Sequence, residues 1–424
     1  MLTERIRKAK DAYVNDMPSI SYERARIWTE SYKKTEGQSA VIRRAQAFKD
    51  VCEQLCVTIF EGELIVGAIG EFRKCGILTP EFSWSWVDRE MDNFSTREQD
   101  PYQMTAEQRA FVRENIFPYW KGKSVEEAFL ARISPETAKV GVDTGIVDTD
   151  SKWRQSVGEI TPDYKDGLFT KGWQGIIDEC KEKLSHVKLT DADGTEKRDF
   201  YQSVILCGEG MITLGKRYAE EAARLAKKET DTVRRQELLV ISDICSRIPA
   251  QPPKTFQEAL QMIWFYQWGG IIMENPLSLN PGRFDQYMYP YYQYDIENKL
   301  HTDDEILELI ECYWLKLSEW VWTISANTAD FFAGYNQFQN LTVGGCDRKG
   351  KDATNELSFL ALKATGELKT HQPGLSVRIS HDSPREFVDA IMELVAQGTG
   401  FPAIHSDKTG YAMLKNLGYE TEDA

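Results

Sequence analysis

The sequence lacks the residue clusters that hold zinc ions or iron–sulfur clusters. Its eight cysteines include no Cys-x-x-Cys pair, and its five histidines are equally scattered. Because such sites draw their ligands from closely spaced cysteines and histidines, we expect no metal in this chain. Dispersed thiols of this kind are typical of buried, reduced cysteines.

Long apolar runs and a surplus of positive charge are also missing. The longest nearly apolar run, Met262–Met273, is interrupted by Gln267 and is too short to span a bilayer. The N-terminal segment has charges at helical spacing and no apolar signal-peptide core. The net charge of −15 argues against nucleic acids and anionic membranes as partners. We therefore expect a cytoplasmic protein.

The short motifs of common enzyme classes are absent as well. The sequence contains no GxGxxG, GxxxxGK[ST], HExxH or GxSxG motif. With 424 residues, 42% of them hydrophobic, the chain can bury a full core. Functional residues are therefore to be sought in loops at the ends of strands, where α/β proteins place their sites.

The periodicity of apolar residues predicts one α/β domain with a helical N-terminal region. Residues 1–273 are expected to be mainly helical, with one short strand at Glu63–Gly67. From residue 274 onward strands and helices alternate, with strands expected at 339–345, 374–380 and 401–406. The residues 302–305 and 383–386 read as capping boxes that start two of the helices. This alternation predicts an α/β barrel or an open parallel sheet.

The stretch Asn275–Tyr292 is the most distinctive part of the chain. Pro276 and Pro281 exclude a helix interior, so we expect this stretch to run extended. In a strand Arg283 and Asp285 would share one face, which favours a structural ion pair between them. Ser278 is equally well explained as a donor to a substrate oxygen or as a turn residue.

Other candidate site residues lie in loops or at strand ends. Arg154, in an irregular segment rich in aspartate, could clamp an anion or pair with local acids. His405 beside Asp407 could be a general acid or base, or a structural histidine. Phe332 and Asn336 belong to an aromatic segment that is either core or the wall of a cavity.

Several segments resemble the glycyl radical enzymes of the pyruvate formate-lyase type, in the branch of glycerol dehydratase, choline trimethylamine-lyase and the arylacetate decarboxylases. They are Ser21–Arg26, Asp50–Gly67, Gly282–Pro290, Phe338–Gly345, Gln372–Arg378 and Gly398–Ala403. These segments occur in the order of the family from one end of the chain to the other.

The resemblance implies the first half of a ten-stranded α/β barrel within a single domain, 1–424. The radical cysteine loop and the C-terminal glycyl radical domain would then follow Ala424, so we expect no radical residue and no bound cofactor here. The glycyl radical would be installed by a separate S-adenosylmethionine radical activase, and a homodimer is implied. This chain alone would be inactive.

The same resemblance constrains the substrate. Glu159 and Leu277 stand where glycerol dehydratases carry histidines, and Ser278 matches their serine. Arg154 lies near the anion-binding arginine of sulfonate-cleaving relatives. These matches favour a small organic anion, either an arylacetate that is decarboxylated or a hydroxyalkyl sulfonate whose C–S bond is cleaved. A neutral-substrate dehydratase, an amine lyase and a non-catalytic subunit remain alternatives.

Overall fold

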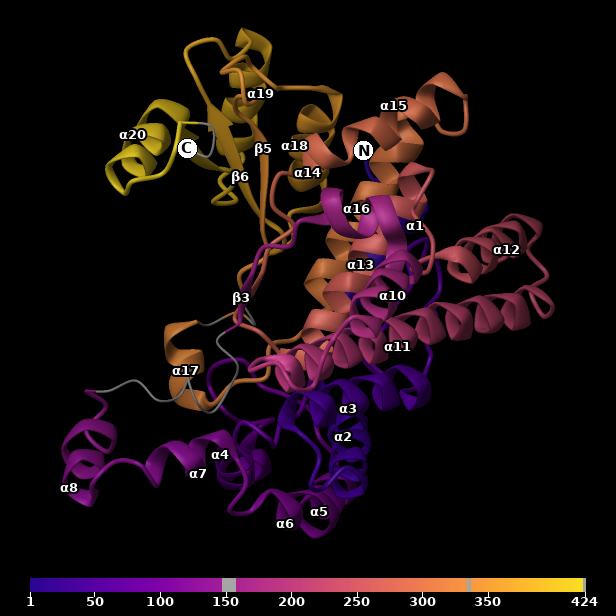
Figure 1. The fold of residues 1–424 in the computed structure, drawn as a ribbon. Coiled ribbons are helices and arrows are strands. Elements are labelled where there is room, and N and C mark those ends of the chain that lie inside the picture. Colours follow the sequence, from indigo (N-terminus) through magenta and orange to yellow (C-terminus); the bar gives the residue numbers. More distant parts are fainter. Residues whose placement is uncertain (147–157, 333, 335–336, 422–424) are drawn as a thin grey trace.

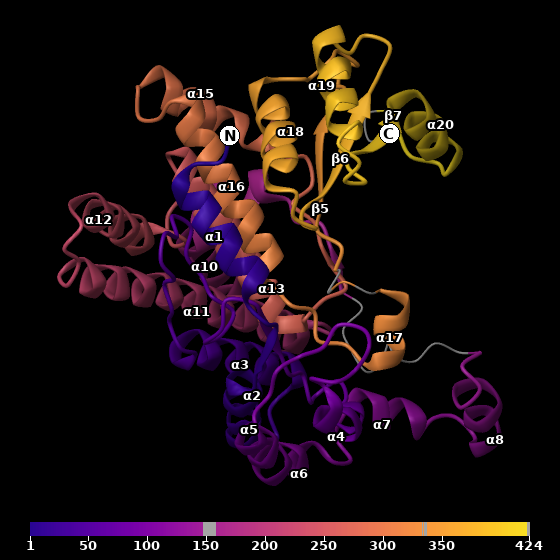
Figure 2. The same cartoon turned by 180° about the vertical axis from the view of Figure 1, so that it is seen from behind.

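The computed structural model describes residues 1–146, 158–332, 334 and 337–421. In Figure 1 helices α2–α7, in indigo and purple, lie at the bottom, and strands β5 and β6 stand at the top beside helices α18–α20. Figure 2 shows the first helix, α1, lying along α16 at the back of the molecule, and the two helices are in contact.

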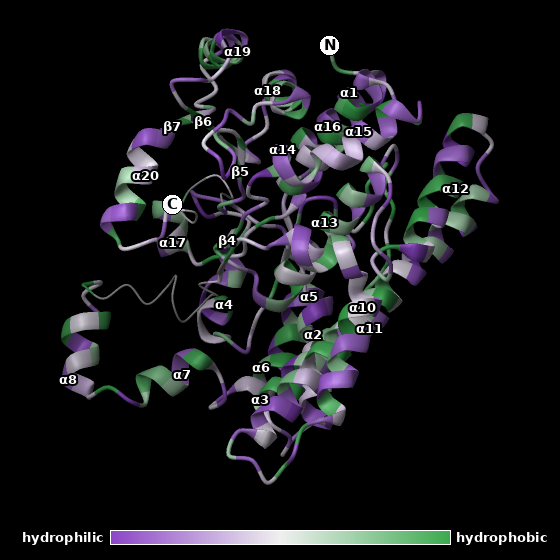
Figure 3. Ribbon diagram, turned by 45° about the horizontal axis from the view of Figure 1, so that its top comes forward, coloured by the Kyte–Doolittle hydropathy of each residue, from purple (hydrophilic) through white to green (hydrophobic). Residues whose placement is uncertain are grey.

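Helices account for most of the chain before residue 275. The helices there are α1 (Glu4–Asn15), α2 (Glu23–Lys34), α3 (Ala40–Gln54), α4 (Ser85–Glu90), α5 (Ala106–Phe111), α6 (Phe117–Trp120), α7 (Val125–Leu130), α8 (Pro135–Thr137), α10 (Phe169–Ser185), α11 (Gly194–Ala226), α12 (Thr232–Arg247) and α13 (Phe256–Glu274). Figure 3 shows apolar and polar residues alternating along α11, as expected of a helix with one apolar side.

The remaining helices alternate with short strands. They are α14 (Phe284–Tyr287), α15 (Tyr289–Glu297), α16 (Asp303–Glu319), α17 (Ala326–Phe331), α18 (Glu356–Leu368), α19 (Arg385–Val395) and α20 (Asp407–Asn416). The strands are β1 (Ser19–Ser21), β2 (Cys75–Ile77), β3 (Glu159–Ile160), β4 (Ser278–Leu279), β5 (Asn340–Gly344), β6 (Gly374–Ile379) and β7 (Ala403–Ser406). The parallel pair β1–β2 was not predicted from the sequence.

Strands β3 to β7 lie side by side in chain order, and all of them are parallel. Ladders join β3 to β4, β5 to β6 and β6 to β7. Two bridges, Ser278 to Phe338 and Gly282 to Leu341, join the β4 segment to the β5 segment. Parallel neighbours in chain order are connected by right-handed crossovers, which place the helices on one face of the sheet. The predicted half of an α/β barrel is therefore confirmed.

The predicted strand Glu63–Gly67 is wrong, because helix α13 takes the place of a neighbouring strand. Gln261 on α13 receives a hydrogen bond from Val66 N at 2.9 Å and donates one to Val66 O at 2.7 Å. Trp264 donates its indole N–H to Gly67 O at 2.8 Å. A side chain at Gly67 would lie 2.5 Å from this indole nitrogen, so glycine is required there. Side chains thus satisfy backbone groups that a sheet would otherwise pair.

The stretch after Asn275 is extended only as far as Arg283. Beyond it the chain forms α14 and α15, so the prediction of an extended segment up to Tyr292 is wrong for its second half. Pro290 lies in the first turn of α15, where a missing N–H leaves no hydrogen bond unmade. Proline is compatible both with an extended segment and with the first turn of a helix, so the proline positions alone could not distinguish the two.

Arg283 and Asp285 both bind the backbone that leaves β5, and within the described residues they form no ion pair with each other. Arg283 donates to Gly344 O at 2.9 Å and to Cys346 O at 3.1 Å. Asp285 accepts from Gly344 N at 2.7 Å and from the Ser358 hydroxyl at 2.5 Å. Burial raises the pKa of Asp285, and these two donors oppose the shift. The predicted ion pair is therefore wrong: each of the two residues binds backbone groups at the carboxyl end of β5.

One of the two predicted capping boxes is confirmed. Thr302 and Glu305 exchange the expected side-chain to backbone hydrogen bonds at the start of α16. The second prediction is wrong, because the Ser383 hydroxyl accepts from Ser380 N at 3.0 Å, and Pro384 is the residue that precedes α19. Ser383 therefore closes the turn after β6 and does not cap a helix.

Arg24 on α2 joins three segments in the core. Its side chain has no exposed surface and forms a two-pronged ion pair with Glu81, with distances of 2.9 and 2.6 Å. Its Nε donates to Ile272 O at 2.9 Å, close to the end of α13. The guanidinium also lies 3.9 Å from the centre of the Trp28 ring. Arg24 therefore satisfies a carbonyl that the end of α13 would leave unpaired.

Replacing Arg24 with methionine is expected to lower the free energy of unfolding by about 3–5 kcal/mol, because it leaves Glu81 buried without its partner. The matched control is Arg26→Met on the same helix, whose pair with Glu30 is solvent-accessible and contributes at most about 0.5 kcal/mol. Urea unfolding followed by circular dichroism measures both. Equal midpoints for the two variants would contradict the role given to Arg24.

Glu311 on α16 is a buried carboxyl group, with 2% of the residue exposed. Burial, followed by the nearby carboxylates of Glu367 and Glu308, raises the pKa of Glu311 to about 7. Among the described residues, no hydrogen-bond partner reaches its Oε1 atom. The folded protein therefore keeps a proton on Glu311 at pH values where the unfolded chain has lost it.

Stability is expected to fall as the pH rises from about 4.5 to about 7, because the folded state binds the extra proton in this window. Glu311→Gln should remove this dependence and stabilise the protein at pH 8 by about 1–3 kcal/mol relative to the unmodified chain. Exposed Glu393→Gln is the control and should leave the pH profile unchanged. Melting temperatures measured between acidic and mildly alkaline pH test this, and parallel profiles for the Glu311→Gln variant and the unmodified chain would refute it.

Candidate functional site

The sheet has one apolar face and one polar face. Alternate residues point to opposite faces, and five of them are 0–1% exposed against the helices: Leu279, Leu341, Val343, Leu375 and Val377. The polar face carries the other set, namely Ser278, Asn280, Phe338, Asn340, Thr342, Ser376, Arg378 and His405, aligned by strand register. Two of the predicted site residues, Ser278 and His405, thus lie on the face opposite the one that the helices cover.

Ser278 begins β4 and is one of the least exposed polar residues of the polar face. It is 5% exposed, and within the described residues its hydroxyl makes no hydrogen bond. Its backbone is fixed on one side, since Ser278 N donates to Gly158 O at 3.0 Å. On the other side Phe338 N donates to Leu277 O at 2.9 Å. The hydroxyl is therefore available to a molecule that lies on the polar face.

Phe338 and Phe332 form an aromatic edge beside Ser278. Phe338 is directly opposite Ser278 in the bridge between β4 and β5, and 45% of it is exposed. Its ring meets Phe332 edge-on at 5.9 Å, and Phe332 meets Trp322 in the same way at 5.9 Å. Phe332 therefore supports Phe338, which is the aromatic group nearer to the face.

His405 lies at the other end of the same face. In register His405 pairs with Arg378, which pairs with Gly344, six residues along the chain from Phe338. Six residues of strand correspond to about 20 Å. A small molecule that contacts Ser278 therefore does not contact His405, and these two predicted site residues are not brought together.

Arg378 and Asp407 form an ion pair beside His405. Arg378 Nε lies 2.6 Å from Asp407 Oδ1, and Asp407 is 11% exposed. Burial is the main reason that the pKa of the Cys346 thiol is raised. The Asp407 carboxylate raises this pKa further, and the Ser380 hydroxyl lowers it. His405 itself is exposed. This end of the face is a charged network at the carboxyl ends of β5, β6 and β7.

Three predicted site residues are described only in part or not at all. Arg154 and Asn336 lie outside the described residues. For Glu159 the backbone alone is described: it belongs to β3 and stands directly opposite Ser278. The register therefore brings the positions of Glu159 and Ser278 together.

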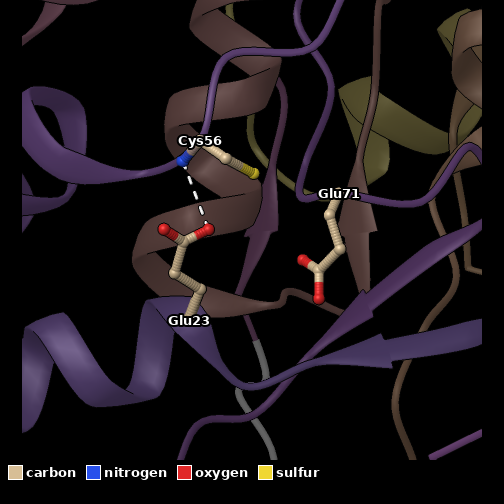
Figure 4. A group of neighbouring side chains, drawn as sticks. All are labelled: Glu23, Cys56 and Glu71. Atoms are coloured by element: carbon tan, nitrogen blue, oxygen red, sulfur yellow. Dashed lines mark hydrogen bonds between the residues drawn. The ribbon is translucent and has the colours of Figure 1, made fainter.

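Two sets of residues were missed by the sequence reasoning. The first is the polar row Asn340, Ser376 and Arg378, which the alternation within the strands could have indicated. The second is a group formed by Glu23, Cys56 and Glu71, whose potential ligand atoms lie within 4.8 Å of one another (Figure 4). These residues are far apart in sequence, so spacing gave no signal.

The Glu23–Cys56–Glu71 group has the residue types of a metal site, with a thiol that is protonated in the metal-free chain. Burial and then Glu23 raise the pKa of Cys56 to about 12, so the thiol keeps its proton. Glu23 also accepts a hydrogen bond from Cys56 N at 3.2 Å. Metals bind the thiolate, and two adjacent carboxylates disfavour that form in the absence of a cation.

A cavity of about 990 Å³ lies on the helical side of the molecule, away from the polar face. It is bounded by α1, residues 59–62 and the facing ends of α11 and α12. Its lining holds five basic side chains, Arg5, Lys8, Arg73, Lys228 and Arg234, and five acidic ones, Glu4, Glu61, Glu229, Asp231 and Glu237. A lining with balanced charge favours neither anions nor cations.

A family model described as "Pyruvate formate lyase-like" matches residues 2–424. The chain belongs to this family. The isethionate sulfite-lyase of Nitratidesulfovibrio vulgaris is 34% identical over 415 residues, which are 96% of this chain and 50% of that protein. The expected family and the half-barrel fold are thus confirmed.

Solved structures of pyruvate formate lyase-like proteins agree with this fold over the whole chain. A structure from a study of 1,2-propanediol dehydration in Roseburia inulinivorans matches with a TM-score of 0.96 at 35% identity, covering 100% of this chain and 53% of that one. The glycerol-bound, B12-independent glycerol dehydratase of Clostridium butyricum matches with a TM-score of 0.94 at 37% identity, with 100% and 53% covered. The chain spans about half the length of the relatives it matches. In the described residues, no helix has the length and apolarity needed to cross a membrane.

Proposed function

We propose that this chain is the N-terminal, substrate-binding portion of a glycyl radical lyase that cleaves a small organic anion. The leading reaction is cleavage of the C–S bond of a hydroxyalkyl sulfonate. The observation that carries the proposal is Ser278, a residue only 5% exposed on the polar face of a half-barrel, whose hydroxyl makes no hydrogen bond within the described residues. The isethionate sulfite-lyase relative supports the choice of reaction.

Ser278 is assigned to a substrate oxygen. The hydroxyl can donate to that oxygen and also accept from a substrate hydroxyl, which suits a hydroxyalkyl compound. Closure of the site in the full-length protein would keep water from competing for the same hydrogen bonds. Radical intermediates react with water and oxygen, so a closed interior is also what the proposed chemistry needs.

An anion is favoured over a neutral diol by the residues beside Ser278. Leu277 is apolar and packs against the core, so this end of β4 offers no imidazole to a diol. We assign Arg154 to the anionic group, because a guanidinium forms paired hydrogen bonds with sulfonate or carboxylate oxygens. Glu159, opposite Ser278 in register, is assigned to the substrate hydroxyl. Asn336 is kept as a weaker candidate for a substrate contact, whereas His405 is too far from Ser278 along the strands to share a small substrate with it.

Decarboxylation of an arylacetate is the second candidate. It is favoured by Phe338 and Phe332, which offer an aromatic surface next to Ser278. A neutral-substrate dehydratase or amine lyase would need a different group in place of Arg154, and a non-catalytic subunit would need no substrate site.

The radical residues are proposed to lie beyond Ala424. Seven cysteines belong to the helical region or to β2, and Cys346 follows β5 at the end of the sheet remote from Ser278. A glycyl radical installed by an S-adenosylmethionine radical activase would supply the hydrogen abstraction. The proposal includes a homodimer, a cytoplasmic location and no cofactor held by this chain.

The first test uses the protein at its natural full length, activated without oxygen by its activase. An electron paramagnetic resonance doublet of a glycyl radical and release of sulfite from isethionate are expected. Ser278→Ala should keep the radical signal but lower kcat/KM by roughly 10- to 100-fold, as loss of a hydrogen bond to a charged or polarised substrate predicts. Absence of the radical would refute the radical lyase. A radical with neither sulfite release nor carbon dioxide release from arylacetates would refute the anion.

The second test concerns Arg154. Arg154→Ala is expected to weaken isethionate binding by roughly 10- to 100-fold, because a charge-assisted hydrogen bond is worth about 1.5–3 kcal/mol. Lys165→Ala, which removes an exposed cation nearby in the sequence, is the control. Isothermal titration calorimetry on the unactivated protein gives the affinities. Unchanged affinity for Arg154→Ala would favour a neutral substrate.

A further inference from the structure

Four polar side chains form a row of hydrogen bonds across the polar face, one step along the strands from Ser278. Asn280 Nδ2 donates to the Thr161 hydroxyl at 3.3 Å, and Asn280 Oδ1 accepts from Asn340 N at 2.8 Å. The Ser376 hydroxyl then donates to Asn340 Oδ1 at 2.9 Å. The row links the segments of β3, β4, β5 and β6 through the side chains of Thr161, Asn280 and Ser376 and through both the backbone N–H and the side chain of Asn340.

The two asparagines of this row differ in how many ends of the side-chain carboxamide form hydrogen bonds. Asn280 uses both ends of its carboxamide, the oxygen toward Asn340 and the nitrogen toward Thr161. Asn340 uses only its oxygen, and in the part of the chain that the structure describes its Nδ2 group has no acceptor. Asn340 is exposed on the face, whereas Ser376 is 4% exposed and therefore held in place.

Ser376 holds the Asn340 carboxamide in place through one hydrogen bond. An asparagine side chain can exchange its oxygen and nitrogen by a half-turn, and the hydrogen-bond partners decide which end points where. The Ser376 hydroxyl donates to Oδ1, and the NH2 group is the end of the carboxamide that has no acceptor among the described residues. Two N–H donors are thus presented at a fixed place on the sheet.

Asn340 is close enough to Ser278 for one small molecule to reach both. Ser278 is opposite Phe338, and Asn340 is the next residue on the same face of the same strand. One strand spacing and two residues along the strand separate the Cα atoms of Ser278 and Asn340 by about 8 Å. A molecule of a few heavy atoms spans the remaining gap between the side chains.

We infer that Asn340 is a specificity-determining residue whose NH2 group binds the sulfonate or carboxylate oxygens of the substrate, while Ser278 binds its hydroxyl oxygen. This inference rests on the proposed function. A carboxamide nitrogen offers donors only, so it accepts an anionic oxygen and rejects a cation such as a quaternary ammonium group. Ser376 is a positioning residue, since it acts on the substrate only through the orientation of Asn340.

The test measures binding of isethionate and of neutral 1,2-propanediol to the full-length, unactivated protein by isothermal titration calorimetry. Asn340→Asp keeps the shape of the side chain but replaces two donors by a negative charge. It should weaken isethionate binding by roughly 30-fold or more and change propanediol binding by less than about 3-fold. Ser376→Ala should weaken isethionate binding by about 3- to 10-fold, and Ser376→Thr, which keeps the hydroxyl, should restore it.

Thr342→Ala is the matched control, because Thr342 lies on the same face of the same strand and has no place in the row. Its affinities should equal those of the unmodified protein, and the circular dichroism spectra of all variants should coincide. If isethionate binds the unmodified protein and Asn340→Asp equally well, the inference is wrong and the proposed function stands. If the unmodified protein binds neither isethionate nor an arylacetate, the proposed function fails and the inference fails with it.

Discussion

The position of the candidate site depends on how helix α13 ends. A helix leaves its last carbonyl groups unpaired, and in a buried place they need donors from elsewhere. Arg24 supplies one to Ile272 O, and Trp322 donates to the carbonyl of Asn275, the left-handed residue that ends the helix. Asn275 in turn donates to Thr323 O. The chain therefore leaves α13 in one direction only, and Ser278 follows three residues later.

Polar side chains that point toward the helices hold the strands in register. Gln339 alternates with the residues of the polar face and is 1% exposed, and its amide donates to Leu317 O on α16 at 2.7 Å. Gln337 is fully buried and donates to Trp320 O at 2.8 Å in the same way. A slip by one residue would expose these amides on the polar face and bury Asn340 among apolar groups. The buried glutamines thus fix which residues the substrate can meet.

The sequence predicted the parts of the fold that follow from periodicity. Strands β5 and β6 and helices α18 and α19 were found because each buries an apolar stripe or alternates with period two. The strand at Glu63–Gly67 was wrong because its hydrogen-bond partners are side chains of α13, far along the chain, which no local pattern reveals. The ion pair of Arg283 with Asp285 was wrong for the same reason: both residues bind the distant end of β5.

The site was predictable one residue at a time but not as an arrangement. Ser278 and His405 are both on the polar face, yet only the register shows that they lie at opposite ends of it. Asn340 carried no motif, and its importance follows from the single hydrogen bond that Ser376 donates to it. Sequence patterns locate strands, whereas the reach of a small molecule is decided by how neighbouring strands are aligned.

The charge of the polar face bears on the substrate. Among its described residues the one cation, Arg378, is engaged by Asp407 and lies far from Ser278. Near Ser278 the described donors are neutral, so they favour an anion whose charge is spread over several oxygens, as in a sulfonate. A compact charge would need a fixed counter-ion to offset the loss of its hydration in an enclosed place. The end of the face at Ser278 and Asn340 therefore suits a diffuse oxyanion, and the charged end at Arg378 belongs to the structure of the sheet.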